Sequence, residues 1–280
     1  MNVRKRRVMR ALVHYRNSAG LSMEEAAERS LCGVGTIHRM ENGLNAVPLR
    51  VKTLLELYGA PPDVVHEMVQ LAKDRDRSGI VRHYRDLISK TLGEYLELES
   101  EASDLSLLEW DLVHGLLQTE AYARAVISVS AFNPSESEIE RLVELRMARQ
   151  ARFSAGNPPE LVAVLGETAL YNQVGGPKVL RAQLEHLQNL GKLPSVTIQV
   201  LPFTAGAQPA SGTNFILLGF PDQADPDVVF TENLVGFSIL EDAEDVRPFK
   251  LAFSRVLGEA LSPRQSAKLI SRAVADLSTS

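Results

Sequence analysis

The sequence predicts two domains: an N-terminal all-α domain of five helices over residues 1–78 and a C-terminal α+β domain over residues 79–280. Residues 20–43 predict two short helices joined by a tight turn, and later residues contain several short apolar strand segments with segregated helices, which favours α+β. With 280 residues, of which 45% are hydrophobic, the chain can bury a large core and is too long for one small helical unit.

The helix pair is predicted from its capping residues. Ser22 is a good N-cap, and Glu25 three residues later can complete a capping box, so a helix begins there. The next helix runs over about residues 33–40, with Ile37 and Met40 on its buried side, and the glycine of the following Asn-Gly pair can end it. Two short helices joined in this way have the geometry of a DNA reader.

Proline and glycine positions predict the remaining helices of this domain. Pro48 begins a helix that Gly59 ends, and a fifth helix covers about residues 62–77. The charged run 73–79 then predicts the domain junction, because alternating charges and a glycine bury little surface. The alternative is that this run is the solvated end of a continuous helix.

Charge is distributed unevenly along the chain. Residues 1–60 hold ten lysines and arginines against five acids, whereas the whole chain has a net charge of −5. A basic segment attached to an acidic body is typical of a nucleic-acid-binding module. The N-terminal arginines either neutralise DNA phosphates or belong to a solvated first helix; they are Arg4, Arg6, Arg7 and Arg10.

The helix pair carries a run of residues at a characteristic spacing: Gly20-Leu21-Ser22, then Ala27, then Thr36-Ile37-His38-Arg39-Met40-Glu41-Asn42-Gly43. This spacing resembles the Xre family of helix-turn-helix regulators, the λ-repressor-like type, over about residues 4–60. The resemblance implies a five-helix λ-repressor-like fold and a structural ion pair between Arg16 and Glu41. It implies groove-facing residues at Val34, Gly35, Thr36, His38 and Arg39, and DNA-backbone contacts near Ser22, Met23, Asn42 and Asn45.

The chain departs from the family pattern where DNA contact matters most. Met23 replaces the usual glutamine, Leu31 replaces the usual turn glycine, and valine and glycine at positions 34 and 35 replace polar base readers. Valine can only touch a thymine methyl group, and glycine has no hydrogen-bonding side chain. Direct readout is therefore left to Arg39 and, more weakly, His38. The alternative is that the domain has kept its fold and lost tight DNA binding.

The C-terminal domain mixes helical and strand patterns. Helices are expected at about residues 92–102, 119–130, 135–153 and 177–190, with two more beginning near residues 245 and 262. Strands are expected at residues 105–112, 160–165, 196–201, 214–220, 228–232 and 237–240. At residues 196–201, for example, valine and isoleucine alternate with threonine and glutamine, which is typical of a half-buried strand.

Four motifs occur in order in this domain: Gly115-Leu116-Leu117-Gln118-Thr119-Glu120-Ala121-Tyr122-Ala123-Arg124-Ala125, Leu145-Arg146-Met147-Ala148-Arg149-Gln150, Val174-Gly175-Gly176-Pro177, and Val200-Leu201-Pro202-Phe203 before Gly206. They are similar to the uncharacterised C-terminal domain found behind Xre-type domains in many actinobacterial developmental regulators. The resemblance implies a transcriptional regulator of the toxin-antitoxin-like class, often encoded beside a small partner protein. His114 stands where that family usually has proline.

A cluster of polar residues among apolar ones predicts a pocket for a small molecule or a peptide partner. Its members are Trp110, Gln118, Thr119, Tyr122 and Arg124. The alternative is that Thr119 caps a helix, Tyr122 belongs to the core and Arg124 pairs with a nearby acid. The long loop at residues 202–212 either contacts a ligand or partner or serves as flexible cover.

Enzyme, metalloprotein and membrane-protein classes have no support in the sequence. The histidines lack metal-ligand spacing, no Walker or Gly-x-Ser-x-Gly motif occurs, and no cofactor is expected. The single cysteine, Cys32, excludes an internal disulfide, and no apolar run approaches the ~20 residues of a membrane span, so a cytoplasmic protein is expected. The leading hypothesis is a homodimeric regulator that binds double-stranded DNA. The alternative is a protein-interaction module with a degenerate helix-turn-helix.

Overall fold

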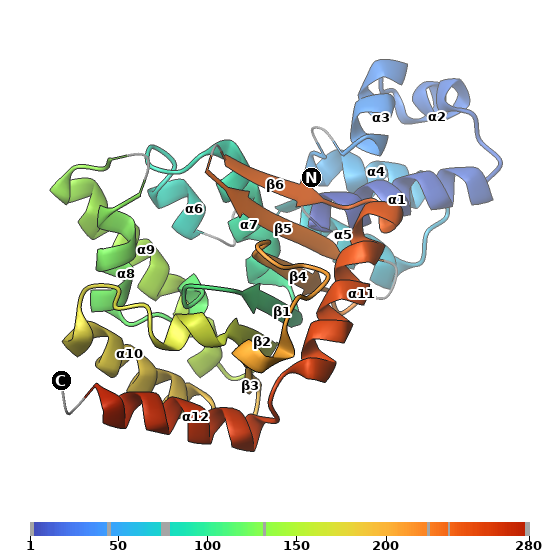
Figure 1. Ribbon diagram of the computed structural model, residues 1–280. Helices are drawn as coiled ribbons and strands as arrows, with labels where there is room; N and C mark the ends of the chain where they lie inside the picture. The colour runs from blue at the N-terminus through green and yellow to red at the C-terminus, as the bar shows by residue number, and fades with distance from the viewer. Residues whose placement is uncertain are drawn as a thin grey trace. The chain divides into compact units, whose positions relative to one another are not determined.

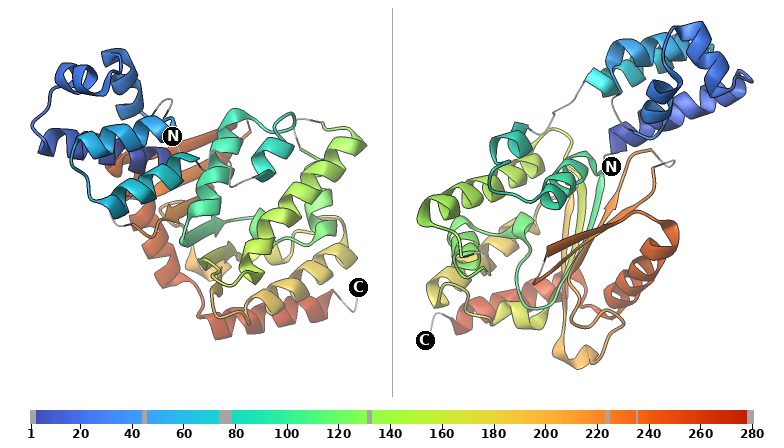
Figure 2. Two further views of the ribbon diagram at one scale, coloured as in Figure 1. Left: turned by 180° about the vertical axis from the view of Figure 1, so that it is seen from behind. Right: turned by 90° about the horizontal axis from the view of Figure 1, so that it is seen from above.

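The structure is a computed structural model that describes residues 3–43, 46–73, 79–130, 133–222, 225–234 and 236–277. The chain divides into two compact units, Met1–Arg82 and His83–Ser280. Figure 1 and Figure 2 show the first unit as a group of helices and the second as a sheet with helices on both faces. Each unit has a hydrophobic core within its own residues.

The helical fold predicted for the first unit is confirmed. Over residues 3–73 the structure describes α1 (Val3–Ser18), α2 (Met23–Ser30), α3 (Val34–Glu41), α4 (Pro48–Leu57) and α5 (Pro62–Lys73). The capping box is present, because Ser22 Oγ accepts from Glu25 N at 3.1 Å and Glu25 Oε2 accepts from Ser22 N at 2.8 Å. Ile37 and Met40 are 0% exposed in the core. Residues 74–78 of the charged run lie outside the described residues.

The turn between α2 and α3 places a leucine in a left-handed conformation. Leu31, the C-cap of α2, has φ 54° and ψ 28°, and its side chain is 95% exposed. Leucine pays about 1–2 kcal/mol for this conformation, whereas glycine adopts it freely. The turn nevertheless forms, since the Leu31 N–H donates to the carbonyls of Ala27 and Glu28 and so satisfies the helix end.

The second unit follows a short helix, α6 (Gly79–His83), and contains six longer helices among its described residues. These are α7 (Lys90–Glu101), α8 (Glu120–Ser128), α9 (Glu136–Gln150), α10 (Pro177–Leu190), α11 (Ala243–Glu259) and α12 (Pro263–Asp276). Its strands are β1 (Asp104–Glu109), β2 (Glu160–Gly166), β3 (Val196–Leu201), β4 (Phe215–Gly219), β5 (Val228–Asn233) and β6 (Gly236–Leu240). The expectation of a strand as far as residue 112 is wrong, because β1 ends at Glu109. The backbone N–H of Trp110 donates to the Asn214 side chain instead of to a neighbouring strand.

The strands form one mixed sheet in the order β3-β2-β1-β4-β5-β6. β1, β2 and β3 are parallel, whereas β4 pairs antiparallel with β1 and β5, and β5 with β6. Leu107 of β1 therefore lies opposite Ala163 on one side and Ile216 on the other. Parallel neighbours need long crossover connections, and α8, α9 and α10 supply them.

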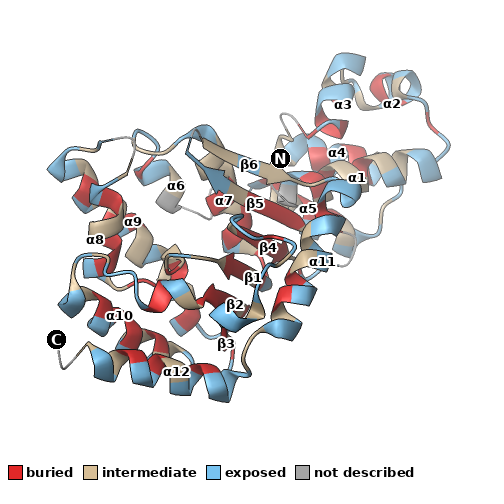
Figure 3. Cartoon of the chain, viewed as in Figure 1, coloured by how far each residue is buried: buried red, intermediate tan, exposed pale blue. Residues whose placement is uncertain are grey.

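Helices cover both faces of this sheet (Figure 2). On one face, Phe249 and Phe253 of α11 meet Phe215 edge to face, with ring centroids 5.1 and 6.4 Å apart. On the other face, Tyr95 of α7 stacks on Phe230 with a centroid separation of 3.8 Å. Figure 3 shows that the central strands are largely buried, whereas β6 at the sheet edge is half-buried. The helices of the second face also enclose the space described below.

Candidate functional site

The exposed side of α3 is the candidate DNA-reading surface of the first unit. Val34, Gly35, His38 and Arg39, called here the α3 face, are exposed, and Thr36 is half-buried. A Cβ at Gly35 would meet nothing within 4 Å, so the α3 face is open at this position. The Arg39 side chain makes no hydrogen bond or ion pair with another described residue, so its guanidinium donors are available to an external acceptor.

An ion pair fixes the end of α3 against α1. Arg16 Nε donates to Glu41 Oε1 at 2.7 Å and Arg16 Nη2 donates to Glu41 Oε2 at 2.9 Å, while Nη1 reaches the Leu21 carbonyl at 2.8 Å. The two side chains are 11% and 3% exposed. The hydrogen bond to Glu41 raises the pKa of Arg16, against the effect of burial. The pair ties the end of α3 to α1, and the hydrogen bond of Nη1 ties α1 to Leu21, which precedes the N-cap of α2.

Two residues expected near the DNA backbone act as helix caps. Ser22 Oγ caps α2, and Asn42 Nδ2 donates to the His38 carbonyl at 2.7 Å at the end of α3. Both residues are exposed, whereas Met23 is half-buried and packs against the core of the first unit. A thioether has no donor for a phosphate oxygen, so Met23 contributes packing at this position.

The N-terminal arginines differ in exposure. Arg6 is 5% exposed, and a phosphate contact by its guanidinium stays a prediction. Arg7 and Arg10 are half-buried on α1, and a phosphate contact by either stays a prediction. The Arg4 side chain and Asn45 lie outside the described residues.

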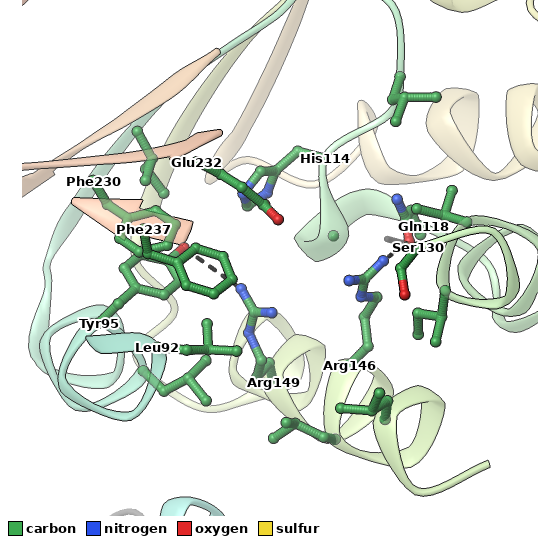
Figure 4. Close-up of a pocket in the computed structure, with 18 of the residues that line it drawn as sticks. Leu92, Tyr95, His114, Gln118, Ser130, Arg146, Arg149, Phe230, Glu232 and Phe237 are labelled. Carbon is green, nitrogen blue, oxygen red and sulfur yellow. Dashed lines mark hydrogen bonds between the residues drawn. The ribbon is translucent and has the colours of Figure 1, made fainter. Parts of the chain in front are cut away.

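The second unit contains a cavity of about 650 Å³ between α7, α8, α9 and the sheet (Figure 4). This volume lies in the range of roughly 300–1,000 Å³ that is usual for small-molecule sites. Most of the wall is apolar. A few polar side chains interrupt it, and those used below are Glu109, His114, Gln118, Arg146, Arg149 and Glu232. Such a wall is typical of a ligand site.

One side of the cavity is an aromatic stack. The rings of Tyr95 and Phe230 are stacked at 3.8 Å and 19°, and those of Phe230 and Phe237 at 5.5 Å and 20°. Figure 4 shows this stack beside Leu92 and Arg149. The Arg149 guanidinium lies 5.7 Å from the Tyr95 ring centroid, within the range of a cation–π contact.

Arg149 is fully engaged with a buried acid. Its Nε donates to Glu99 Oε1 at 2.9 Å and its Nη2 to Glu99 Oε2 at 2.6 Å, while Tyr95 Oη donates to the same carboxylate at 2.5 Å. The Glu99 side chain is 3% exposed. Burial would raise the pKa of Glu99, but the charge and hydrogen bonds of Arg149 outweigh it and hold that pKa below its usual value.

Arg146, one turn away on α9, has no carboxylate partner among the described residues. Its Nη1 donates to Gln118 Oε1 at 2.7 Å, and Gln118 Nε2 in turn donates to the Val113 carbonyl at 2.6 Å. Burial, reinforced by the charge of Arg149, lowers the pKa of Arg146 to about 10. The side chain therefore stays protonated at neutral pH and points into the cavity wall beside Gln118 (Figure 4).

Two further titratable groups are neutral in this environment. Burial, with the charges of Asp111 and Glu232, raises the pKa of Glu109 to about 8, although Arg146 opposes the shift. Burial, with the charge of Arg149, lowers the pKa of His114 to about 3. His114 Nδ1 accepts from Leu116 N at 3.2 Å, so its proton is on Nε2, and its φ of −60° is one that proline also adopts.

The described residues hold no group of three or more histidine, cysteine, aspartate or glutamate side chains placed to bind a metal ion. Nor does any described helix have the length and apolar character needed to cross a membrane.

Two protein families match the chain. Residues 10–68 match the family described as "Helix-turn-helix domain", and residues 92–272, more than half of the chain, match the family described as "Domain of unknown function (DUF5753)". The chain belongs to the DUF5753 family. Comparisons with curated proteins and with solved structures found no match.

Of the five residues expected to form a ligand site in the DUF5753 domain, the structure brings Gln118 to the cavity. Thr119 Oγ1 caps α8 by accepting a hydrogen bond from the backbone N–H of Tyr122 at 3.3 Å, and the Tyr122 side chain is 0% exposed in the core. Arg124 forms a bidentate ion pair with a glutamate of α9 at 2.6 and 2.7 Å. Trp110 Nε1 donates to a backbone carbonyl at 3.2 Å. These four side chains have structural partners instead of lining the cavity.

The sequence analysis did not predict the charged residues that line the cavity, although the spacing of two arginines was a signal for them. Arg146 and Arg149 are three residues apart on α9, which places both on one side of the helix among apolar neighbours. Glu109 and Glu232 had no comparable signal, because each ends a strand region and reaches the cavity only through the pairing of β1, β4 and β5.

The raised pKa of Glu109 predicts a pH-dependent stability. Between about pH 4.5, its ordinary pKa, and about pH 8, its pKa in the folded protein, the unfolded carboxyl loses its proton while the folded one keeps it. The protein therefore loses stability as the pH rises through this window. Glu109→Gln does not titrate, so we expect it to be more stable than the parent by about 1–3 kcal/mol at pH 8 and similar to it below pH 4.5.

Urea unfolding of the two proteins at about pH 4.5 and pH 8 measures this difference. Glu160→Gln, which alters an exposed glutamate at the start of β2, is the matched control and should keep the parent's pH dependence. A Glu109→Gln protein with the same pH dependence as the parent would contradict the assignment.

Proposed function

We propose that the protein is a sequence-specific transcriptional regulator of the Xre type that binds double-stranded DNA as a homodimer. Its helix-turn-helix domain indicates DNA binding and transcription regulation. In this proposal residues 1–78 read DNA, and residues 79–280 receive a signal from a ligand or from a small protein encoded beside it, as in toxin-antitoxin-like systems. The function of the DUF5753 domain itself is unknown.

The α3 face carries the proposal for DNA reading. Arg39 is exposed there with its donors unused, and an arginine can bind the O6 and N7 atoms of a guanine through two hydrogen bonds. The Arg16–Glu41 pair holds the end of the same helix against α1, which supports a defined backbone position for Arg39. A rigid helix with a free arginine is what direct readout requires.

Binding of the purified full chain to DNA from around its own gene, compared with scrambled DNA at two salt concentrations, tests the proposal. Tight, selective and salt-sensitive binding is expected. Weak binding without preference would contradict it.

Arg39→Ala is expected to weaken binding to the specific site by about 1–3 kcal/mol and to leave binding to scrambled DNA almost unchanged, because a base contact is lost. The control is Lys52→Ala, which removes one charge from an exposed Lys52–Glu56 pair on α4. Competition binding at fixed salt measures both. Equal losses on specific and scrambled DNA would show that Arg39 does not read a base.

A second candidate function is protein docking through a degenerate helix-turn-helix. The observation that favours it is the composition of the α3 face, where Val34 is 39% exposed and Gly35 offers no side chain to a base. Under this alternative the DNA experiment gives weak, unselective binding, and binding appears only when a partner protein is supplied.

A further inference from the structure

The cavity of the DUF5753 domain contains an arginine that the protein does not neutralise. Arg146 donates one hydrogen bond, to the neutral amide of Gln118, and pairs with no acid among the described residues. By contrast, Arg124, Arg141 and Arg149 of the same domain each hold a carboxylate through two hydrogen bonds. Arginine has five N–H donors, so Arg146 has several left for an external acceptor.

The acids that line the cavity do not fill this role. Glu109 has a pKa raised to about 8, so its carboxyl is protonated at neutral pH and can donate a hydrogen bond. Glu232 is exposed and forms no ion pair with Arg146 in the structure. A protonated guanidinium and a neutral carboxyl that line the same cavity together suit an acceptor with a negative charge.

The rest of the cavity suits an apolar group. The stack of Tyr95, Phe230 and Phe237 forms a flat wall, and Leu92 lies beside it (Figure 4). The apolar ring surface that such a stack presents to the cavity can pack against an aromatic ring or an aliphatic group. The volume of about 650 Å³ admits a small molecule and is too small for a folded partner.

We propose that this cavity binds a small organic carboxylate, with the carboxylate on Arg146 and the apolar body against the stack of Tyr95, Phe230 and Phe237. We infer further that the bound carboxylate is the signal that the DUF5753 domain receives. This role as a signal rests on the proposed function.

The observations favour a carboxylate over other charged groups. The planar guanidinium matches two carboxylate oxygens. A phosphate dianion brings a second negative charge, and the other arginine of the cavity lining, Arg149, is already paired with Glu99. An amine would be repelled by the Arg146 guanidinium, which pairs with no acid among the described residues, and the Glu99 carboxylate beside Arg149 is already engaged with that arginine. A single negative charge therefore fits the wall best.

Direct binding to the DNA-free full chain at pH 7 tests the proposal. The probes are 2-naphthoate, indole-3-acetate and octanoate, each with its neutral amide, together with 2-naphthylmethylamine and 1-naphthyl phosphate. Calorimetry or ligand-observed NMR measures the affinities. We expect at least one carboxylate to bind with a stoichiometry of one molecule per chain. Its affinity should be about tenfold higher than that of its amide, or more.

Arg146→Gln should remove that preference, so that the carboxylate and its amide bind alike. The matched control is Arg124→Gln, which changes an arginine of the same domain outside the cavity and should retain the preference. Arg146 has no acid partner among the described residues, so its replacement leaves no carboxylate unpaired and removes one hydrogen bond, to Gln118. The unfolding midpoint of the variant, measured beside its binding, shows that it is folded. Arg146→Lys, which keeps the charge without the planar fork, should retain part of the preference.

The proposal is overturned if no carboxylate binds more tightly than its amide, if the amine or the phosphate binds most tightly, or if the preference survives Arg146→Gln. None of these results bears on DNA binding, which is measured separately, so failure of the carboxylate site and failure of the proposed DNA reader remain distinguishable. Addition of the bound carboxylate should change the affinity for the specific DNA site, and an unchanged affinity would overturn its role as the signal.

Discussion

Arg149→Met is expected to lower the free energy of unfolding of the DUF5753 domain by about 3–5 kcal/mol, because it removes one partner of a buried ion pair. Glu99, which is 3% exposed, would then keep the Tyr95 hydroxyl as a donor and would either stay charged without a counter-ion or take up a proton. The desolvation cost of that carboxylate, now offset by two hydrogen bonds from Arg149, would be uncompensated. Urea unfolding of the full chain, with hydrogen exchange of α7 and α9 to locate the effect, measures the loss.

The same domain supplies a matched control for this prediction. Arg124 and Glu140 form a bidentate pair with similar distances, 2.6 and 2.7 Å, but their side chains are 34% and 51% exposed. Arg124→Met should therefore change stability little. The double variant Arg149→Met with Glu99→Leu should recover most of the loss, since no charge is left buried. Equal losses from Arg149→Met and Arg124→Met would show that burial does not decide the effect.

Glu41→Ala is expected to lower the stability of the helix-turn-helix domain by about 3 kcal/mol and to weaken binding to specific DNA as well. Without Glu41, the Arg16 guanidinium keeps its hydrogen bond to the Leu21 carbonyl but has lost its counter-ion, although the side chain is only 11% exposed. The end of α3 would lose its tie to α1, so the α3 face would no longer be held in one orientation.

Glu56→Ala is the matched control for Glu41→Ala, because Glu56 forms an exposed ion pair with Lys52 at 3.7 Å on α4. It should leave both unfolding and DNA binding nearly unchanged. Hydrogen exchange of α1 and α3 in the full chain distinguishes local loosening from global unfolding. If the Glu41 and Glu56 variants behave alike in both measurements, the ion pair does not position α3.

Local signals in the sequence were sufficient to place most secondary structure. The capping box of Ser22 and Glu25 and the prolines at 48, 177 and 263 mark helix starts, and short apolar runs mark strands, because these preferences act between residues close in the chain. β1 was predicted too long, since a side chain from the start of β4, Asn214, captures the amide that would have continued the strand. A contact of that range leaves no trace in a local pattern.

The sequence by itself determined the division into a helical and an α+β part, the helix-turn-helix and the surface on which its exposed residues lie, because periodicity and caps are local properties. Only the tertiary structure decided which charges matter. Arg6 is buried, and Arg124 is paired at the surface. Arg146 has no acid partner among the described residues and lines a cavity whose walls come from α7, α8, α9, β1, β4, β5 and β6. Burial and pairing depend on segments that are distant in the chain, so the same residue type can be a structural partner in one place and a free binding group in another.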